Sequence, residues 1–571
     1  MRSLCLGIVE EDLLLPFPRI GGETAETLKA VLDSIDDLLG PKADAFRAWD
    51  AEGKMPLSFI DELRTFGLFG LVVPEAFGGL GFGSLAYSRT LQQIARHDAS
   101  VAVTVGAHNS IGMRGLLLFG TEAQRRTYYP KLASGEMIAA FCLTEPEAGS
   151  DAASIKTVAV DEGDHFRLNG SKLWITNGEI ADFFTVFAKT GPKDSRGKLS
   201  AFIVTRDMPG VSVAPHEDKM GLRASYTNAV FFDDVKVPKE NLLGPLHGGF
   251  KVAMKILNSG RSGLGGGAVG AMKRLIGLAA TQAKERRQFG RAIGEFGLVK
   301  QKIGQMVVDC YAAEAVVTLV AGWVDAGSDD YAVEAAIGKV FASEALWRTA
   351  DEALQVAGGN GYMRDYPYER FLRDSRINRI FEGTNEILRL FIALNAMNDV
   401  GTQLEELAAS LQDVFLHPIK GFGVLSEYAR KHVSLATGAG RSRFTQLHPR
   451  LDRVASQFEG DVRILAQVVD RLLRKHGRNI VEKQLATRRL ADIMIDLFVL
   501  AAILARVDGR IRSRGEAASR QDLAILEVFA GAAQRRIARN FADVDENEDE
   551  PLKALADHAM ARGGYEWDVF G

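Results

Sequence analysis

One glutamate, Glu382, has the clearest potential for chemistry in this sequence. It lies in residues 379–387 (RIFEGTNEI), after Ile380 and Phe381 and before Gly383. A carboxylate held among apolar side chains loses solvation, so its pKa rises and it becomes a better base near neutral pH. A lone glutamate in a loop is more often exposed to solvent. By itself, this segment is compatible with a catalytic base and with a surface loop.

Two segments could hold a flat or polar ligand. Residues 141–151 (FCLTEPEAGSD) offer hydroxyls, backbone donors and a tight turn, which suits a phosphate or a polar cofactor edge. A plain turn into the next domain fits equally well. In residues 172–178 (KLWITNG), Trp174 and Thr176 can face one side of a strand and form a wall for a ring system. A tryptophan in the core is the alternative.

Two further segments lie at predicted helix ends. Residues 285–290 (ERRQFG) could bind pyrophosphate and stack on an aromatic ring, or could be a solvated helix end. Residues 355–361 (QVAGGNG) form a natural helix C-cap, and the same glycines would let a ligand approach the backbone. Neither segment decides between these alternatives alone.

The letters of a dinucleotide-binding fingerprint occur at Gly265-x-Gly267-x-x-Gly270. The residues before it, KVAMKILNSGR, predict a helix rather than a strand, and no βαβ unit surrounds it. We therefore interpret these glycines as a helix face that packs closely against a neighbour. The sequence has no HExxH, Walker A or GxSxG motif, and its ten histidines are scattered, so we predict no metal site.

Length and composition narrow the class of protein. A chain of 571 residues is too long for one core and predicts several domains. Its net charge of -4 gives no basic footprint for nucleic acid. Its three cysteines form no CxxC pair, which suits a reducing compartment. The longest apolar run, Leu497–Ala505, is too short to span a membrane, and the acidic N-terminus lacks the features of a targeting peptide. We expect a bacterial cytoplasmic protein, or a mitochondrial matrix or inner-membrane protein if the source is eukaryotic.

The pattern along the chain predicts an α+β fold that is mainly α-helical. An Asn169-Gly170 pair within alternating residues indicates a β-hairpin, and the acidic run Asp543–Glu550 indicates a solvated loop. The order is α, β, α and then extra α. Four domains are predicted: a helical domain at 1–138, a β domain at 139–247, a helical bundle at 248–398 and a further helical domain at 399–571.

Taken together and in this order, the segments resemble the acyl-CoA dehydrogenase family. The resemblance is dense over residues 55–400 and rests on FCLTEPEAGSD, KLWITNG, MGLRASYTNAVFFDDVKVPKENLLG, ERRQFG, QVAGGNGY and IFEGTNEI. HPRLDRVASQFEGDVRIL, VEKQLATRRLADIMIDLFVLAAILAR and MARGGYEW are similar to the C-terminal extension of its very-long-chain branch. The family implies an N-terminal helical domain, a middle β-barrel-like domain and a C-terminal helical bundle, here with an extra C-terminal helical domain.

The resemblance also implies FAD as the cofactor and assigns residues to it. Five side chains are expected to line the isoalloxazine: Phe141, Leu143, Thr144, Trp174 and Thr176. Ser150 should meet the flavin or the pantetheine arm of the substrate. Five residues should hold the pyrophosphate and adenosine across a dimer interface: Arg286, Gln288, Phe289, Gln355 and Gly359. Thr384 and Glu386 should contact the cofactor near its ADP half, although Glu386 adds a charge where several relatives have a neutral amide. Four more residues are expected to contact acyl-CoA: Asn258, Arg261, Phe381 and Gly383.

Glu382 matches the catalytic base of the family. Some members carry this glutamate just before the arginine that matches Arg261, but that position here is Gly260, which cannot act as a base. The implied reaction is α,β-dehydrogenation of an acyl-CoA to a trans-2-enoyl-CoA in fatty acid β-oxidation. Glu382 would take the α-proton, and the Glu382 N–H and a flavin hydroxyl would stabilise the thioester oxygen.

The family further implies an electron-transferring flavoprotein as partner and a homodimer. Small residues at Ala102, Gly106 and Ala107 resemble the floor of the acyl site and would suit a long or very long chain, or they could be a close helix–helix contact. Residues 420–443 combine apolar and basic side chains and could contact a membrane, although an ordinary surface helix fits as well.

Two other functions are compatible with the resemblance. An acyl-CoA oxidase shares the flavin half but passes electrons to oxygen; the ending Asp568-Val-Phe-Gly is not a peroxisomal address. An interaction or assembly protein that keeps the fold is the alternative from another class. The complete set of expected flavin and base positions favours an enzyme.

Overall fold

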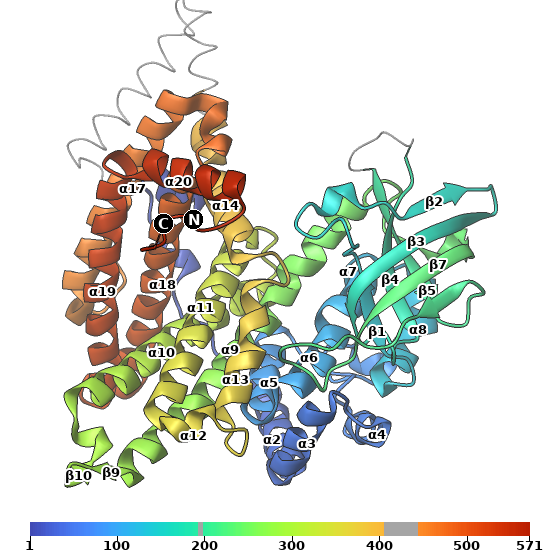
Figure 1. Ribbon diagram of the computed structural model, residues 1–571, viewed down its shortest axis with the longest axis horizontal. Coiled ribbons are helices and arrows are strands. Elements are labelled where there is room, and N and C mark those ends of the chain that lie inside the picture. Colours follow the sequence, from blue (N-terminus) through green and yellow to red (C-terminus); the bar gives the residue numbers. More distant parts are fainter. Residues whose placement is uncertain (192–197, 403, 405–442, 571) are drawn as a thin grey trace, which may run out of the picture. The chain divides into compact units, whose positions relative to one another are not determined.

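The computed structural model describes residues 1–191, 198–402, 404 and 443–570 (Figure 1). They form two compact units: one spans Phe17–Ile387, and the other combines Met1–Pro16 with Leu388–Gly571. The predicted fold class, α+β and mainly α-helical, is confirmed, because most of the described elements are helices and one large sheet holds both parallel and antiparallel strand pairs. Residues 420–442 of the segment predicted to contact a membrane lie outside the described residues.

The larger unit begins with helices. Its helix starts follow ordinary capping chemistry: in α8, the Thr121 hydroxyl accepts from the Gln124 N–H while the Gln124 side chain accepts from the Thr121 N–H. The helices are α2 (Gly22–Leu39), α3 (Ala43–Glu52), α4 (Leu57–Thr65), α5 (Ser84–His97), α6 (Ala99–Gly106), a π-helical turn (Ala107–Gly112), α7 (Arg114–Phe119) and α8 (Glu122–Ser134).

A buried histidine, His108, fixes the π-helical turn. Its Nδ1 accepts from the N–H of Ala139 at 2.9 Å, and its Nε2 lies 3.1 Å from the carbonyl oxygens of Phe69 and Leu132. Nε2 therefore carries the proton. Burial lowers the pKa of His108 to about 4, so the ring is neutral and joins three segments without contributing a charge.

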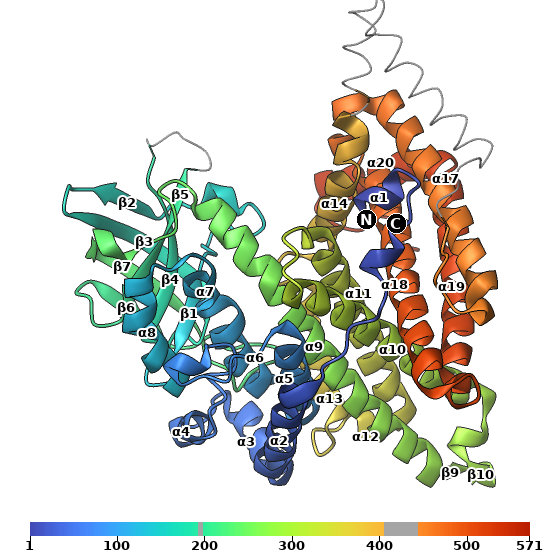
Figure 2. The ribbon, with the colours of Figure 1, turned by 180° about the vertical axis from the view of Figure 1, so that it is seen from behind.

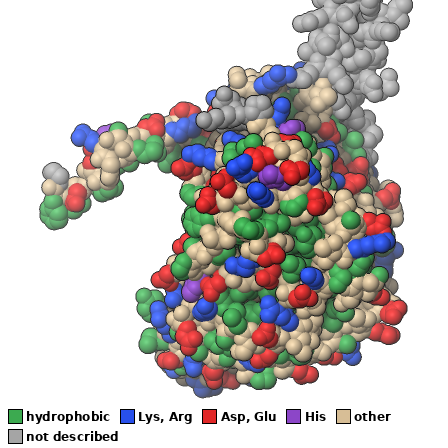
Figure 3. All heavy atoms as spheres, turned by 90° about the vertical axis from the view of Figure 1, so that its right-hand side faces the viewer, with side chains coloured by type: hydrophobic (Ala, Val, Ile, Leu, Met, Phe, Trp, Pro, Cys, Tyr) green, Lys and Arg blue, Asp and Glu red, His purple; other side chains and the backbone are tan. Residues whose placement is uncertain are grey.

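The middle of the larger unit is a β-sheet. Its strands are β1 (Ala139–Cys142), β2 (Val158–Asp161), β3 (His165–Thr176), β4 (Phe183–Lys189), β5 (Leu199–Thr205), β6 (Val211–Val213), β7 (Thr227–Pro238) and β8 (Leu242–Leu243). They pair in the order β6-β7-β3-β2-β4-β5-β8, and β1 pairs in parallel with β4. The strands carry apolar residues toward a core that includes Phe184 and Phe202. On the molecular face shown in Figure 3, basic and acidic side chains are interspersed.

The hairpin predicted at Asn169-Gly170 is wrong. Both residues lie inside the continuous strand β3, where its register against β7 shifts between Leu168 and Gly170. The Asn169 side chain donates to the carboxylate of Asp234 on β7 and accepts from the Asp234 N–H, at 2.9 Å each. Gly170 has a φ of 149°, and a Cβ there would lie 2.5 Å from the Thr157 hydroxyl. The pair forms a β-bulge that brings two backbones close together.

A helical bundle follows the sheet. It contains α9 (Gly249–Glu285), a short hairpin of β9 (Arg287–Gln288) and β10 (Arg291–Ala292), α10 (Gly297–Asp325), α11 (Ala332–Ala357), α12 (Gly359–Tyr362) and α13 (Tyr368–Arg376). Helices α9, α10 and α11 pack side by side, and α5 packs on α9 (Figures 1 and 2). The glycines of the fingerprint lie inside α9, where a Cβ at Gly270 would lie 2.0 Å from the carbonyl oxygen of Gln92 on α5 and a Cβ at Gly265 would lie 2.6 Å from the Val317 side chain on α10. The prediction of a close-packed helix face is therefore confirmed.

Helix α10 is long and apolar enough to cross a membrane by composition, which the sequence reading did not single out. Its apolar window is mostly buried within the bundle. Such burial is typical of a core helix in a soluble fold, so α10 is weak support for a membrane span.

The second unit is helical throughout its described part. It contains α1 (Arg2–Cys5), most of α14 (Asn385–Ala396), α17 (Asp452–His476), α18 (Gln484–Arg514), α19 (Arg520–Asp545) and α20 (Asp549–Arg562). The apolar run Leu497–Ala505 is buried inside α18. The acidic run is only partly the solvated loop that we predicted: α19 continues to Asp545, and Asp549 starts α20 and accepts two 2.7 Å bonds from Arg489.

Candidate active site

Glu382 lies in a strained turn between α13 and α14. The short helix Ile377–Arg379 ends just before it, and the backbone then becomes left-handed at Glu382 (φ 56°) and Gly383 (φ 93°). The Thr384 hydroxyl accepts from the Ile387 N–H at 3.3 Å and so caps the start of α14. A non-glycine residue in this region costs energy and occurs mainly where surrounding structure holds it, as at functional sites.

The Glu382 carboxylate is set up to accept a proton. Its Oε2 is buried and has no hydrogen-bond partner among the described residues. Desolvation raises the pKa of Glu382, and the positive charges of Arg261 and Lys339 oppose this rise. An unpartnered buried carboxylate oxygen is rare in folded proteins and calls for an explanation. The arrangement is not that of a solvated surface loop, and a buried carboxylate with a free acceptor is chemically able to take up a proton.

Helix α9 supplies the opposite wall of this site. A Cβ at Gly260 would lie 3.7 Å from Oε2 and 3.8 Å from Oε1 of Glu382. The next residue, Arg261, is buried and donates from Nη1 to Oδ1 of Asn258 at 2.5 Å. Burial lowers the pKa of Arg261 to about 10, and the charge of Glu382 opposes this change. The structure thus brings Asn258 and Arg261 together beside Glu382, as the resemblance implies.

The two segments expected to line the flavin, residues 141–151 and 172–178, are hydrogen-bonded to each other. Strand β3 donates to the loop after β1 twice: from the Leu173 N–H to the carbonyl of Thr144 at 2.9 Å, and from the Lys172 ammonium to the carbonyl of Leu143 at 3.2 Å. Phe141 is half-buried and Leu143 is buried. The two segments therefore form one continuous surface.

A buried ion pair holds this loop in place. The side chain of Lys172 is fully buried and lies 2.7 Å from Oε1 of Glu145. The Glu145 carboxylate also accepts from the N–H groups of Lys156 and Thr157. A buried pair is stable only when its remaining hydrogen-bonding groups are satisfied, as they are here.

Trp174 is not a core residue, so the alternative that it is a tryptophan of the core is excluded. It is 62% exposed, has a φ of 56° and lies where the register of β3 against β7 shifts for a second time. A bulge of this kind redirects a side chain next to a functional site. Ile175 is part of the buried core of the sheet, whereas Thr176 is half-buried. Ser150 is exposed near the end of the neighbouring loop.

The residues expected at the other end of the cofactor are exposed on the bundle. They are Arg286, Gln288 and Phe289 around the β9–β10 hairpin, and Gln355 and Gly359 around the C-cap of α11. Phe289 is 93% exposed and has a φ of 53°. Within the larger unit, this hairpin lies at the end of the bundle away from the sheet that carries Trp174 (Figures 1 and 2). The two groups of residues are therefore not brought together within one chain. Glu386 is exposed in the first turn of α14.

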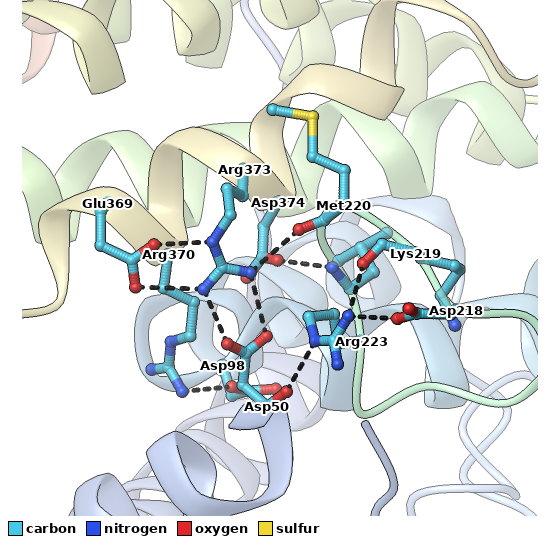
Figure 4. Close-up of polar contacts among 11 residues, drawn as sticks. Asp50, Asp98, Asp218, Lys219, Met220, Arg223, Glu369, Arg370, Arg373 and Asp374 are labelled. Carbon is cyan, nitrogen blue, oxygen red and sulfur yellow. Dashed lines mark hydrogen bonds and ion pairs between the residues drawn. The ribbon is translucent and has the colours of Figure 1, made fainter. Parts of the chain in front are cut away.

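Helix α13, which leads to Glu382, is anchored by a polar cluster (Figure 4). Arg373 binds Asp50 of α3 at 2.7 Å, Glu369 of its own helix at 2.6 Å and the carbonyl of Met220 in the middle domain at 3.0 Å. Asp374 accepts from the N–H of Leu222 at 2.5 Å. One helix turn thus ties together the N-terminal helices, the sheet domain and the bundle.

The Asp374 carboxyl is buried, and this gives a testable pH dependence. Desolvation and the nearby Asp98 raise its pKa to about 7, while Arg370 and the Leu222 N–H oppose the rise and Asp50 adds to it. A carboxyl with a raised folded-state pKa contributes stability that is full near pH 4 and is lost as the pH rises through 7. We expect Asp374→Asn to raise the melting temperature at pH 8 by about 2–4 °C, with no gain at pH 5, in thermal melts followed by circular dichroism.

The matched control for this substitution is Asp218→Asn, which removes an exposed carboxylate from the same cluster. It should change the melting temperature little at either pH. Equal melting temperatures of Asp374→Asn and the unaltered protein at pH 8 would contradict the assignment of Asp374 as a buried, neutralised acid.

Sequence reasoning missed the charged residues that support the site. Lys339 and Lys172 are both buried, and each donates to a loop that carries expected site residues. A weak signal exists for Lys339, which stands alone among apolar residues in AIGKVFA. The partners of both lysines lie far away along the chain, so spacing could not reveal them.

Comparison with known proteins agrees with this architecture. Family models match the N-terminal domain (residues 25–136), the middle domain (140–235) and the C-terminal domain (247–397) of acyl-CoA dehydrogenases. A fourth, the ACAD9/ACADV C-terminal domain, matches residues 449–565. With this fold and this site, the chain belongs to the acyl-CoA dehydrogenase family.

Its relatives include members with the C-terminal extension. The chain is 40% identical to the human very long-chain specific acyl-CoA dehydrogenase, mitochondrial, over 98% of this chain and 87% of the relative. It is 36% identical to a probable acyl-CoA dehydrogenase of Bacillus subtilis, over 92% of this chain and 86% of the relative. A crystal structure of an acyl-CoA dehydrogenase complexed with FAD from Bacillus anthracis superposes with a TM-score of 0.81 at 32% identity, covering 98% and 94% of the two chains.

The chain is therefore a FAD-dependent oxidoreductase, and its residues fit this cofactor. The exposed indole of Trp174 and the hydroxyls of Thr144 and Thr176 suit a flat ring with polar edges. The exposed guanidinium of Arg286 suits a pyrophosphate.

Proposed function

We propose that this enzyme dehydrogenates long- or very-long-chain acyl-CoA to trans-2-enoyl-CoA, with Glu382 as the base that removes the α-proton. One observation carries this proposal: the buried Oε2 of Glu382 has no partner among the described residues and faces Gly260 and Arg261. A buried carboxylate with an unused acceptor is poised for general base catalysis.

The turn around Glu382 supplies a second function. Its N–H has no acceptor in the part of the chain that the structure describes, so it is free to donate to the thioester oxygen as negative charge develops there. A preorganised donor at such an oxygen is worth about 3–4 kcal/mol. An α-proton of a thioester is a weak acid, and this donor lowers the barrier that Glu382 must overcome.

The remaining residues would orient the cofactor and the substrate and exclude water from the site. The continuous surface formed by loop 141–151 and strand β3 would hold the flavin ring, and Asn258 and Arg261 would contact the acyl-CoA. Bound FAD supplies the hydride acceptor for the β-carbon. The protein contributes alignment and desolvation around that chemistry.

The electron acceptor in this proposal is an electron-transferring flavoprotein. The same half-reaction in an acyl-CoA oxidase would produce hydrogen peroxide. Comparing peroxide yield with reduction of an electron-transferring flavoprotein, at equal substrate consumption, decides between them. One peroxide formed for each acyl-CoA consumed would show that the enzyme is an oxidase and not a dehydrogenase. A protein that binds FAD but turns over no acyl-CoA would favour an assembly role.

The acyl-chain preference rests on the very-long-chain relative. Gly106 does not add to it, because an added Cβ there would lie 3.6 Å from Leu91 of α5, which is a helix–helix contact. We expect kcat/KM to rise from butyryl-CoA through octanoyl-CoA to palmitoyl-CoA, by up to about 0.8 kcal/mol of binding energy per buried methylene. A steady-state series with an artificial acceptor measures this, and a maximum at butyryl-CoA would contradict it.

The proposed assembly is a homodimer. The exposed Phe289 and Arg286, at the end of the bundle away from the sheet, would complete the FAD site of a second copy. Sedimentation equilibrium with and without FAD tests this; a monomer that retains FAD would contradict it. We further propose a cytoplasmic location in a bacterium, which the Bacillus relative supports.

A further inference from the structure

A lysine inside the bundle, Lys339, lies next to the proposed base without being part of any expected motif. It occupies the middle of α11, and its exposed fraction is 0%. Burying an ammonium group is costly unless hydrogen bonds and opposite charges compensate for the lost water. Its partners therefore indicate what it does.

Among the described residues, both hydrogen-bond partners of Lys339 lie just after Glu382, in the turn and at the start of α14. The ammonium donates to the carbonyl of Gly383 at 2.7 Å and to Oδ1 of Asn385 at 2.7 Å. The Asn385 amide in turn donates to the hydroxyl of Ser343 and to the carboxylate of Glu344, both at 3.0 Å and both on α11. The residues after Glu382 are thus fixed to one face of α11.

The residues before Glu382 are fixed to the same helix. Arg379 forms an ion pair of 3.2 Å with Glu344. The turn between these two attachments contains the left-handed backbone of Glu382 and Gly383. Backbone strain persists at such a residue only where neighbouring structure holds it. Lys339 is the group that binds the carbonyl inside the turn.

We propose that Lys339 is a positioning residue for proton abstraction: by holding the Gly383 carbonyl, it fixes the turn that presents both the carboxylate and the N–H of Glu382. This inference rests on the proposed function, because it gives Lys339 its role through the base. Lys339 itself does not touch the substrate in this scheme.

The charge of Lys339 adds a second effect. Lys339 and Arg261 of α9 both lower the pKa of Glu382, against the rise caused by burial; Tyr87 of α5 is a further titratable neighbour. Burial lowers the pKa of Lys339 itself to about 7, with Glu382, Glu344 and Glu386 opposing that change and Arg261 adding to it. Below pH 7 the Lys339 cation favours the ionised form of Glu382; above pH 7 this effect fades as Lys339 loses its proton.

The test is Lys339→Met in the FAD-bound enzyme, with the rate of flavin reduction by palmitoyl-CoA followed anaerobically from pH 5.5 to 9. Without the cation, the pKa of Glu382 rises. We expect the acidic limb of the profile to move up by about 1 pH unit and the rate at pH 6 to fall about 10-fold or more. The two profiles should approach each other at high pH. A crystal structure should show Glu382 out of its left-handed conformation.

The matched control is Lys273→Met. Lys273 is another partly buried lysine in the same bundle, paired with Glu314 at 2.5 Å and Gln92 at 3.0 Å, and Glu382 is not among its charged neighbours. It should lose stability without moving the pH profile. If Lys339→Met does not fold, Lys339→Arg keeps the charge but displaces the donor, and should keep the acidic limb while lowering the plateau.

Two outcomes separate this inference from the proposed function. Suppose that Glu382→Gln abolishes flavin reduction, but Lys339→Met keeps the pH profile and the Glu382–Gly383 backbone conformation of the unaltered enzyme. The positioning role of Lys339 is then wrong, while the assignment of Glu382 as the base stands. If Glu382→Gln is as active as the unaltered enzyme, the proposed base itself is wrong.

Discussion

Replacing Glu382 by glutamine should lower the rate of flavin reduction by acyl-CoA about 10³- to 10⁴-fold while FAD stays bound. The amide is nearly isosteric, so the turn at Glu382 and Gly383 and its bond to Lys339 are retained. Only the acceptor for the α-proton is lost. Anaerobic stopped-flow absorbance with palmitoyl-CoA measures the rate, and the absorbance ratio of flavin to protein measures the FAD content.

A control for this substitution is Glu352→Gln on α11, which breaks a partly exposed ion pair with Lys302. Such pairs contribute at most about 1 kcal/mol to stability, so the reduction rate should be unchanged. A near-normal rate of flavin reduction in Glu382→Gln would contradict the assignment of Glu382 as the base. Loss of FAD in that variant would instead indicate a structural role for Glu382.

Moving the carboxylate to the facing helix should restore part of the activity. A Cβ at Gly260 would lie 3.7 Å from Oε2 of Glu382, so a glutamate there can place its carboxylate where that of Glu382 now lies. Steric contact opposes it, because the same Cβ would lie 2.8 Å from Cγ2 of Ile111. We expect Gly260→Glu with Glu382→Gly to come within about 10²-fold of the unaltered enzyme, since an error of about 1 Å costs that much.

Two comparisons make this experiment decisive. Glu382→Gly alone should remain inactive, and adding Ile111→Ala to the double variant should raise its activity by removing the clash. Gly260→Glu alone places two carboxylates together in a buried site, which raises the pKa of one of them and should impair the enzyme near neutral pH. A folded, FAD-bound double variant with no more activity than Glu382→Gly would show that position 260 does not reach the reacting carbon.

The sequence was sufficient for the fold class and for the order of its helical and β regions. Helical periodicity identified the bundle and the helices of the C-terminal extension, because long amphipathic segments with few breakers carry that information locally. The motif around Glu382 and the glycine at position 260 singled out one carboxylate. The glycines of α9 were correctly interpreted as packing contacts from their local context alone.

Features created by tertiary contacts could not be read in this way. The Asn169-Gly170 pair has the letters of a hairpin turn, but its bonds to Asp234 and its contact with Thr157 make it a bulge within a strand. Lys339 binds a carbonyl 44 residues away, so no spacing rule connects it to Glu382. Local patterns specify elements, whereas the supports of an active site depend on which elements meet.

The most direct measurement of the central claim separates proton abstraction from electron transfer. A 3-thia-acyl-CoA has acidic α-hydrogens, but its sulfur in place of the β-carbon leaves no hydride to transfer. In D₂O, mass spectrometry of this ligand reports abstraction of the α-proton alone. The unaltered enzyme should incorporate deuterium at the α-carbon, and Glu382→Gln should bind the ligand without doing so. Incorporation by Glu382→Gln at the rate of the unaltered enzyme would show that another group is the base.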